Sequence, residues 1–335
     1  MLRLFYVVRT MPTHQSVSPS EERPPLIVIV GPTAVGKTRL SIDLAEEMNG
    51  EIVNADSRLF YRGMDIGTAK PTLEERRGVP HHLVDFLHPN DPVSLATFQD
   101  LAFAAIDDVL ARGKIPFLVG GTPQYINAVV ENWQIPRVEP DPELRSRLQR
   151  EADEHGADHL LARLRKVDPV AADRNAGNTR RVIRALEVWE KTGVPITAQQ
   201  GKGTPRYDAL EVELWRPREE LYRRIDDRAM DQIRGGLLDE IRDLIAAGAN
   251  PESPSFSSIG YRQAMPHIRG EATLDDIIER MQFDCHRLVR HQETWWRKNA
   301  RLTRIDLEQP GAEQRVRDLI SGHLARHGLN ISAQE

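Results

Sequence analysis

The feature that most constrains this chain is the segment LIVIVGPTAVGKTRLS at residues 26–41, where an apolar run leads into a glycine-rich loop. The loop fits the pattern Gly-x-x-x-x-Gly-Lys-[Ser/Thr] in full, from Gly31 to Thr38. Such a loop joins a buried strand to a helix, and the free N–H groups at the helix N-terminus face a chain of phosphates. The segment therefore predicts a P-loop NTPase-like α/β fold with a parallel sheet core, and a polyphosphate site.

The residues of this loop have separate expected roles. Gly31 and Gly36 permit backbone conformations that bring the chain against a ligand. Lys37 is expected to place a positive charge on the terminal phosphates, and Thr38 is expected to offer its hydroxyl to Mg²⁺. The expected phosphate-binding residues are Gly31, Thr33, Ala34, Val35, Gly36, Lys37 and Thr38.

Length and composition limit the class of protein. The 335 residues suffice for two domains or for one core with a large insertion, and 40% apolar and 28% charged residues are typical of soluble globular proteins. The single cysteine, Cys285, excludes an internal disulfide and favours the cytoplasm. No stretch approaches the ~18 apolar residues of a membrane helix, so no membrane partner is expected.

Residues 1–23 are expected to form a flexible N-terminal tail, and Met11 is an alternative start. The tail contains a short apolar run at residues 4–8. A weak signal peptide is the less favoured interpretation, because this run is shorter than the usual apolar core of about 7–15 residues.

Hydrophobic periodicity predicts alternating strands and helices after the tail. Buried strands are expected at 26–30, 51–55 and 115–119, because each is a short apolar run bounded by turn residues. Helices are expected at 38–48 and 95–112, where apolar residues recur on one face. This order is typical of an open, mostly parallel sheet.

The pattern changes near residue 138. Residues 138–199 carry helical signals, including a start at Asp141 with a proline after it and an amphipathic run at 182–189. We therefore expect an all-helical insertion domain at 138–199, which divides the core into two parts, 24–137 and 200–308.

The second part of the core is expected to resume the sheet and then to become helical. A strand is expected at 209–215, and residues 217–304 are expected to be mainly helical, with breaks at 251–258 and at Pro266. Residues 309–335 are expected to form a C-terminal helix and tail.

Two predicted strand ends carry candidate chemical groups. Asp56 follows the strand at 51–55, at the edge where ligands bind in α/β proteins, and three roles suit it there: general base, Mg²⁺ ligand or helix N-cap. The strand at 115–119 leads into Gly120-Gly121-Thr122 with no acid, whereas a P-loop ATPase usually places an aspartate there to organise Mg²⁺. The loop is therefore expected to hold a diphosphate leaving group rather than a nucleotide that is hydrolysed.

The distribution of arginine is more informative than the net charge of −5, which argues against a uniformly basic nucleic-acid-binding protein. Solvated helix faces explain most charge runs, but clusters that follow a phosphate loop also suit an anionic partner, and both interpretations stay open. The clusters are Arg174, Arg180, Arg181 and Arg184; Arg216, Arg218, Arg223, Arg224 and Arg228; and Arg287, Arg290, Arg297, Lys298, Arg301 and Arg304.

Further motifs occur in order over residues 26–305. They include ADSRLFYRGMDIGTAKP at 55–71, VGGTPQY at 119–125, IGYRQ at 259–263 and HQETWWR at 291–297. On these motifs the chain resembles the tRNA dimethylallyltransferases, and the combination of DIGTAKP, GGTxxY and GYRQ is specific to that family.

The resemblance implies prenyl transfer from dimethylallyl diphosphate to N6 of adenosine 37 in tRNA, with Mg²⁺ as the cofactor. It implies that Asp56 is the general base, that Lys37 and Thr38 hold the diphosphate, and that Thr122 and Arg224 help to neutralise it. The helical insertion would contact the tRNA anticodon stem-loop, and we expect a cytoplasmic monomer. The residues expected to contact tRNA are Asp56, Ser57, Arg58, Leu59, Arg145, Arg180, Arg181, Arg184, Arg262, His291, Gln292, Trp295 and Arg297.

Two other functions are alternatives. A small-molecule or nucleotide kinase would use the same loop, but it needs an acid at a strand end for Mg²⁺. A nucleic-acid-binding module that binds nucleotide only as a switch would bind tRNA without turnover.

Overall fold

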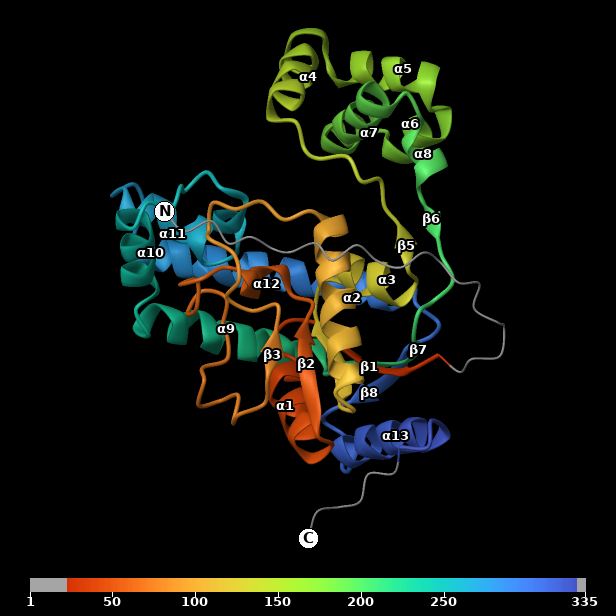
Figure 1. The fold of residues 1–335 in the computed structure, drawn as a ribbon. Helices are drawn as coiled ribbons and strands as arrows, with labels where there is room; N and C mark the ends of the chain where they lie inside the picture. The colour runs from red at the N-terminus through yellow and green to blue at the C-terminus, as the bar shows by residue number, and fades with distance from the viewer. Residues whose placement is uncertain (1–22, 330–335) are drawn as a thin grey trace.

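The sheet at the centre of the fold has six parallel strands in the order β3-β2-β4-β1-β7-β8 (Figure 1). The structure is a computed structural model that describes residues 23–329. Residues 1–22 of the predicted N-terminal tail and residues 330–335 of the predicted C-terminal tail lie outside this range. The strands are β1 (Pro25–Val30), β2 (Gly50–Asn54), β3 (His81–His82), β4 (Ile115–Gly120), β7 (Asp208–Trp215) and β8 (Thr303–Asp306).

The two faces of the sheet bury two separate hydrophobic cores. In β1, Leu26, Val28 and Val30 belong to the core shared with α2 and α3, whereas Ile27 and Ile29 belong to the core shared with α1 and α13. All five side chains are fully buried, as expected for a parallel strand that is covered on both faces. The covering helices are α1 (Lys37–Glu47), α2 (Leu95–Ala111), α3 (Pro123–Val130) and α13 (Ala312–Arg326).

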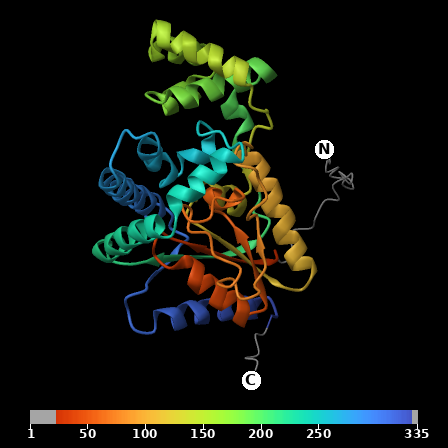
Figure 2. The same cartoon turned by 90° about the vertical axis from the view of Figure 1, so that its left-hand side faces the viewer.

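Four helices from the second half of the chain pack beside the sheet and reach the carboxyl ends of its strands. Helices α9 and α12 pack against each other there (Figure 2). Among residues 23–329, no helix combines the length and the apolar character needed to cross a membrane. The four helices are α9 (Arg218–Arg234), α10 (Leu237–Ala246), α11 (Tyr261–Ile268) and α12 (Leu274–Trp296).

A helical insertion stands apart from the sheet and has its own core (Figure 1). A two-stranded antiparallel ribbon, β5 (Trp133–Gln134) with β6 (Gly201–Lys202), joins it to the rest of the molecule. Buried leucines of its helices, such as Leu148, Leu164 and Leu186, close this core. The helices are α4 (Pro142–His155), α5 (Ala157–Val167), α6 (Pro169–Asn175), α7 (Thr179–Thr192) and α8 (Ile196–Gln199).

The core elements predicted from periodicity are confirmed to within one residue at each end. The strands predicted at 26–30, 51–55, 115–119 and 209–215 are β1, β2, β4 and β7, and the helices predicted at 38–48 and 95–112 are α1 and α2. The predicted helix start at Asp141 is also confirmed, because the Asp141 carboxylate accepts a hydrogen bond from the Leu144 N–H and caps α4.

Two features of the C-terminal half differ from the prediction. The expected break at Pro266 is wrong: Pro266 lies inside α11, close to its C-terminal end, where the missing N–H removes one hydrogen bond from a helix that ends two residues later. Strand β8 was not predicted, because only Ile305 of its four residues is buried and the segment has no apolar run.

Glu51 of β2 is a buried carboxylate whose contacts predict a pH-dependent stability. Its side chain is 1% exposed and accepts hydrogen bonds from Arg112, while His82 and Lys114 also contact it. The hydrogen-bonded Arg112 holds the pKa of Glu51 far below its usual value of 4.5. Because the pKa of Glu51 is lower in the folded protein than in the unfolded chain, its ionised carboxylate stabilises the fold at pH values above its unfolded-state pKa. This stability is lost as the pH falls and the carboxylate takes up a proton.

We therefore expect Glu51→Gln to lower the free energy of unfolding by about 1–3 kcal/mol at pH 7. The difference from the unmodified protein should shrink as the pH falls below 4.5, the ordinary value for this group. Denaturant titrations from pH 3 to pH 7 measure this. Glu47→Gln, which removes a half-exposed ion pair with Arg317, is the matched control and should have a small effect. If Glu51→Gln lost the same amount of stability at every pH, the ionised carboxylate of Glu51 would not be the source of the pH dependence.

Candidate active site

Three neighbouring strands bring the predicted catalytic and phosphate-binding residues to one edge of the sheet. Since β4 lies between β2 and β1, the segments that follow these strands leave the sheet side by side. They carry Asp56 after β2, Thr122 after β4 and Lys37 after β1. A Cβ at Gly120 would lie 2.5 Å from the carbonyl carbon and oxygen of Ala55, so only glycine permits this close approach of β4 to the chain after β2.

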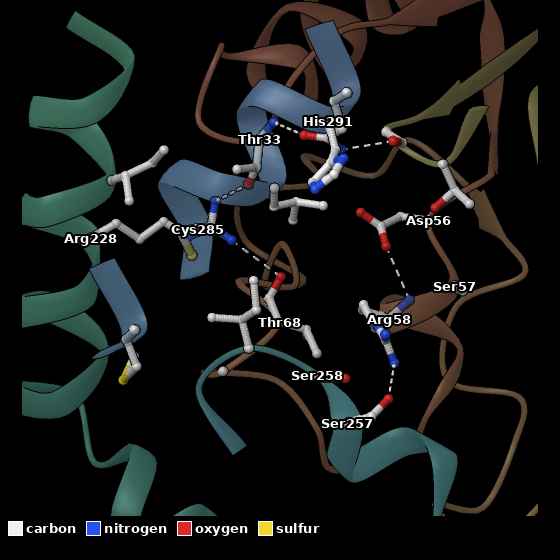
Figure 3. Close-up of a pocket in the computed structure, with 18 of the residues that line it drawn as sticks. Thr33, Asp56, Ser57, Arg58, Thr68, Arg228, Ser257, Ser258, Cys285 and His291 are labelled. Atoms are coloured by element: carbon white, nitrogen blue, oxygen red, sulfur yellow. Dashed lines mark hydrogen bonds between the residues drawn. The ribbon is translucent and has the colours of Figure 1, made fainter. Parts of the chain in front are cut away.

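Two cavities open at this edge and share part of their walls. The smaller cavity has a volume of about 430 Å³ (Figure 3), and the larger has a volume of about 950 Å³. Because the same polar groups line both, ligands in the two cavities would meet at these groups, which we name the junction residues. The junction residues are Thr33, Lys37, Asp56, Thr68 and Arg228.

Lys37 and Arg228 are two partly buried cations within the junction. The Lys37 Nζ donates hydrogen bonds to the carbonyls of Gly31 and Pro32, at 2.9 and 2.7 Å. Burial lowers the pKa of Lys37 to about 8; the negative charge of Asp56 opposes this shift and the positive charge of Arg228 adds to it. Burial also lowers the pKa of Arg228. Two desolvated cations at one place favour an anionic ligand.

Asp56 lies opposite Arg228 across the smaller cavity, and its backbone is fixed by Asn54 (Figure 3). The Asn54 side chain donates to the Asp56 carbonyl at 3.0 Å and accepts from the Asp56 N–H at 2.9 Å. The Asp56 Oδ1 accepts from the Arg58 N–H and so caps the short helix η1 (Ser57–Phe60). The cap uses one carboxylate oxygen and leaves the other for a proton or a cation. The role of Asn54 was not predicted from the sequence.

Helix α9 presents one polar side chain per turn to the loops of the site. The Arg224 Nε donates to the Ala34 carbonyl at 2.8 Å, and Arg224 lines the larger cavity. Arg228 lies one turn further along, within 3.5 Å of the Thr33 hydroxyl and 3.4 Å of the Thr68 carbonyl. Arg224 was predicted as a site residue, whereas Arg228 was predicted only as a member of an arginine cluster. The spacing of four residues is the signal that places both on one helix face.

The smaller cavity combines an apolar wall with polar and aromatic groups from α12. His291 and Trp295 lie along it, and Trp295 is 47% exposed. Gln292 is buried instead: its Oε1 accepts from the Thr33 N–H at 3.0 Å, and its Nε2 donates to the Gly121 carbonyl at 2.7 Å. Gln292 therefore ties the phosphate loop to the loop after β4. The apolar wall contains Ile225, Ala229, Ile259, Met281 and Leu288.

The other residues predicted to contact RNA near the sheet lie in different places. Ser57 and Arg58 line the smaller cavity, and Leu59 lines the larger one. Arg262 donates to the Asp284 carboxylate at 2.9 Å and remains 58% exposed, and Arg297 is exposed at the end of α12.

The predicted RNA-contacting residues of the insertion lie on α4 and α7, where Arg145, Arg180 and Arg184 line a groove of about 520 Å³. Arg145 and Arg184 both donate to the buried carboxylate of Glu187. Arg180 and Arg181 are exposed. Many arginines of the second and third clusters are also paired, for example Arg218 with Glu293 and Arg301 with Glu211, so ion pairing accounts for part of these clusters.

The oxygen groups of the larger cavity suit a hard cation. The Thr38 hydroxyl and the Asp56 carboxylate lie along it, and oxygen ligands are those that Mg²⁺ prefers. Asp208, His323 and His327 also have ligand atoms within 4.8 Å of one another, but Asp208 begins β7, at the opposite end of the strands. There Arg326 donates to His323 at 2.9 Å and His327 contacts Asp208 at 2.9 Å, so these groups are paired without a metal.

Comparisons with known proteins agree with one another. The family described as IPP transferase matches residues 59–299. A tRNA dimethylallyltransferase of Roseiflexus castenholzii is 49% identical over 297 residues, covering 88% of this chain and 97% of that protein. The solved tRNA isopentenylpyrophosphate transferase of Bacillus halodurans is 37% identical, with a TM-score of 0.68 and coverage of 92% and 98%. A solved eukaryotic dimethylallyltransferase acting on tRNA is 28% identical, with a TM-score of 0.76 and coverage of 93% and 81%.

The lowered pKa of Lys37 predicts how anion binding depends on pH. Lys37→Met should weaken the binding of inorganic diphosphate, because it removes a partly buried positive charge that lines both cavities. The affinity difference between the unmodified protein and the variant should be largest below pH 8 and should shrink above it, as Lys37 of the free protein loses its proton. Calorimetric titration from pH 7 to 10 measures both affinities, and the variant corrects for titration of the ligand itself. A constant difference up to pH 10 would contradict the prediction.

Proposed function

This chain belongs to the family of IPP transferases, and we propose that it transfers a dimethylallyl group from dimethylallyl diphosphate to N6 of adenosine 37 in tRNA, releasing diphosphate. It is a prenyltransferase that acts on tRNA. The observation that carries the mechanism is the pair of cavities that meet at Lys37, Asp56 and Arg228, because transfer needs an anionic donor and a nucleophile to meet beside a base.

The larger cavity suits the diphosphate of the donor. The phosphate loop and Lys37 lie along one side of it, and Arg224 and Arg228 of α9 lie along the other. These cations stabilise the negative charge that develops on the leaving diphosphate. Thr122 follows β4 and lines the smaller cavity, from which its hydroxyl would be offered to the same group.

The chemical step is a displacement at C1 of the dimethylallyl group. The N6–C1 bond forms, the bond from C1 to the diphosphate oxygen breaks, and the N6 proton passes to the Asp56 carboxylate. An exocyclic amine is a weak nucleophile, so removal of this proton and orientation of the base both contribute to the rate. The hydrogen bonds from Asn54 fix the Asp56 backbone and so orient its carboxylate.

The smaller cavity suits the adenine base. A base inside a stem-loop must leave its stack to reach such a site, at a cost of a few kcal/mol. The apolar wall, with Met281 and Leu288, offers a surface for its face, while Ser57, His291 and Trp295 lie along the same cavity. Leu59, another residue predicted to contact tRNA, lines the larger cavity.

Mg²⁺ is the proposed cofactor, and the Thr38 hydroxyl is the group that would hold it. When bound, the ion would neutralise diphosphate charge. The exposed arginines on α4 and α7 suit the phosphates of an anticodon stem-loop. We further propose that the enzyme is a monomer and works in the cytoplasm, where its tRNA substrate is found.

The kinase alternative is not favoured by the arrangement of the sheet. In a phosphate-loop kinase, an acid at a strand end beside the loop organises Mg²⁺. Here β4, the neighbour of β1, leads into Gly121 and Thr122, and the nearest strand-end acid is Asp56 after β2, which faces both cavities.

Incubation of the purified protein with radiolabelled dimethylallyl diphosphate, Mg²⁺ and unmodified tRNA, followed by nucleoside digestion, tests the proposed function. We expect label in N6-prenyladenosine. Absence of transfer together with release of phosphate from ATP would overturn the proposal in favour of a kinase, and tRNA binding without either reaction would favour a binding module.

Asp56→Asn should lower turnover by about 10²–10⁴-fold, because the amide cannot accept the N6 proton. The Asn side chain keeps an oxygen that accepts the Arg58 N–H, so the cap of η1 and the fold should be retained. Single-turnover rates and tRNA filter binding measure the two effects, and tRNA affinity should change little. A near-normal rate would remove Asp56 as the general base.

Arg180→Ala combined with Arg181→Ala should weaken tRNA binding and lower the slope of log affinity against log salt by about one for each phosphate that the variant no longer neutralises. Inorganic diphosphate affinity should not change, because both residues lie on the insertion. Arg165→Ala is the matched control, since Arg165 is an exposed arginine of α5 that is paired with Asp173. Equal salt slopes for the double variant and the control would exclude this face from the tRNA interface.

A further inference from the structure

The turn at residues 65–68, within the DIGTAKP motif, forms a wall between the two cavities. Gly67 and Thr68 line the smaller cavity, and Thr68 and Ala69 line the larger one. Thr68 is the one residue of the turn among the junction residues, and side chains of three helices hold the turn in place: Gln232 of α9, Glu240 of α10 and Tyr261 of α11. Resting on the proposed function, we propose that Glu240 of α10 is a positioning residue for prenyl transfer.

The carboxylate of Glu240 receives a converging set of donors. Its Oε2 accepts from the backbone N–H groups of Asp65 and Ile66 at 2.9 and 2.7 Å, and its Oε1 accepts from the Gly67 N–H at 3.3 Å. The Tyr261 hydroxyl donates to the same Oε1 at 2.5 Å. Successive backbone N–H groups of a turn form an anion-binding concavity, and here a side-chain carboxylate fills it.

The carbonyl side of the turn is held as well. The Gln232 Nε2 donates to the carbonyls of Ile66 and Gly67 at 2.9 and 3.0 Å. The ring of Tyr261 is fully buried against Gly67, where an added Cβ would lie 2.4 Å from the ring carbon Cε2. The turn is therefore held by hydrogen bonds to its N–H groups, by hydrogen bonds to its carbonyls and by packing. Glu240 accepts the hydrogen bonds from the N–H groups of residues 65–67.

The turn transmits its position to the reacting groups through Thr68. The Thr68 carbonyl lies 3.4 Å from Nη2 of Arg228, and Arg228 shares helix α9 with Gln232, four residues away. A displaced turn would thus shift one of the two partners that orient the Arg228 guanidinium, the other being the Thr33 hydroxyl. A misplacement of about 1 Å in a transfer site is sufficient to cost about 10²-fold in rate.

The chain supplies a matched control beside Glu240. Asp239 is the preceding residue on α10; its side chain is 78% exposed and pairs with Arg242, and it accepts none of the hydrogen bonds that the N–H groups of residues 65–67 donate to Glu240. Asp239→Asn therefore makes the same chemical change, carboxylate to amide, one residue away. Tyr261→Phe removes a single donor to Glu240 and leaves the three backbone hydrogen bonds in place.

The experiment compares Glu240→Gln, Asp239→Asn and Tyr261→Phe in full-length protein by steady-state kinetics, thermal unfolding and amide hydrogen exchange. In Glu240→Gln the new amide N–H would face the Gly67 N–H, so we expect faster exchange at residues 65–67 and a kcat lowered by about 10–10²-fold. The KM for tRNA should remain near that of the unmodified protein. Tyr261→Phe should have a smaller effect on kcat, and Asp239→Asn should have none.

Three results would overturn the proposal. They are a normal kcat for Glu240→Gln despite faster exchange, an equal loss in Asp239→Asn, and a loss of kcat that only follows the fraction of unfolded protein. Assays at temperatures well below the unfolding midpoint ensure that a lowered kcat does not come from unfolded protein. Tyr261→Phe provides a milder variant if Glu240→Gln does not fold. Failure of the unmodified protein to transfer a prenyl group would refute the proposed function instead, which separates the two failures.

Discussion

The close parallel pairing of β2, β4 and β1 is the constraint on which the active site depends. Parallel strands end at one edge, so three segments far apart in the sequence start there next to each other. The pairing is tight enough that Gly120 has no room for a side chain beside Ala55. Asp56, Thr122 and the phosphate loop are therefore positioned by the backbone of the sheet before any of their own side-chain contacts form.

The second half of the chain completes the site from outside the sheet. Helix α9 holds the phosphate loop through Arg224 and the turn at 65–68 through Gln232, and α12 adds Gln292 between the phosphate loop and Gly121. Each contact ends on a backbone group of a loop, which fixes the loop and leaves the loop's own side chains for the ligands. The loops are thus held in place without a bound ligand, which lowers the entropic cost of binding.

The sequence was sufficient to predict the elements that depend on local residue patterns. The strands β1, β2 and β4, the loop that joins β1 to α1 and the helix start at Asp141 depend on residues adjacent in the chain, and those predictions are confirmed. Gln292 meets Thr33 across 259 positions, and Glu240 meets Ile66 across 174. Such contacts depend on how helices pack, which one sequence does not specify, so the sequence predicts neither that Gln292 joins two loops nor that Glu240 holds the turn.

The insertion is joined to the sheet through the paired two-residue strands β5 and β6 and closes its own hydrophobic core. The ribbon separates the exposed arginines on α7 from the carboxylate of Asp56, because the insertion and the sheet bury separate cores. An RNA that engages both ends must present its backbone and its reactive base at that separation. The proposed function therefore implies selection partly by the length of a folded stem-loop, a property that many different nucleotide sequences share.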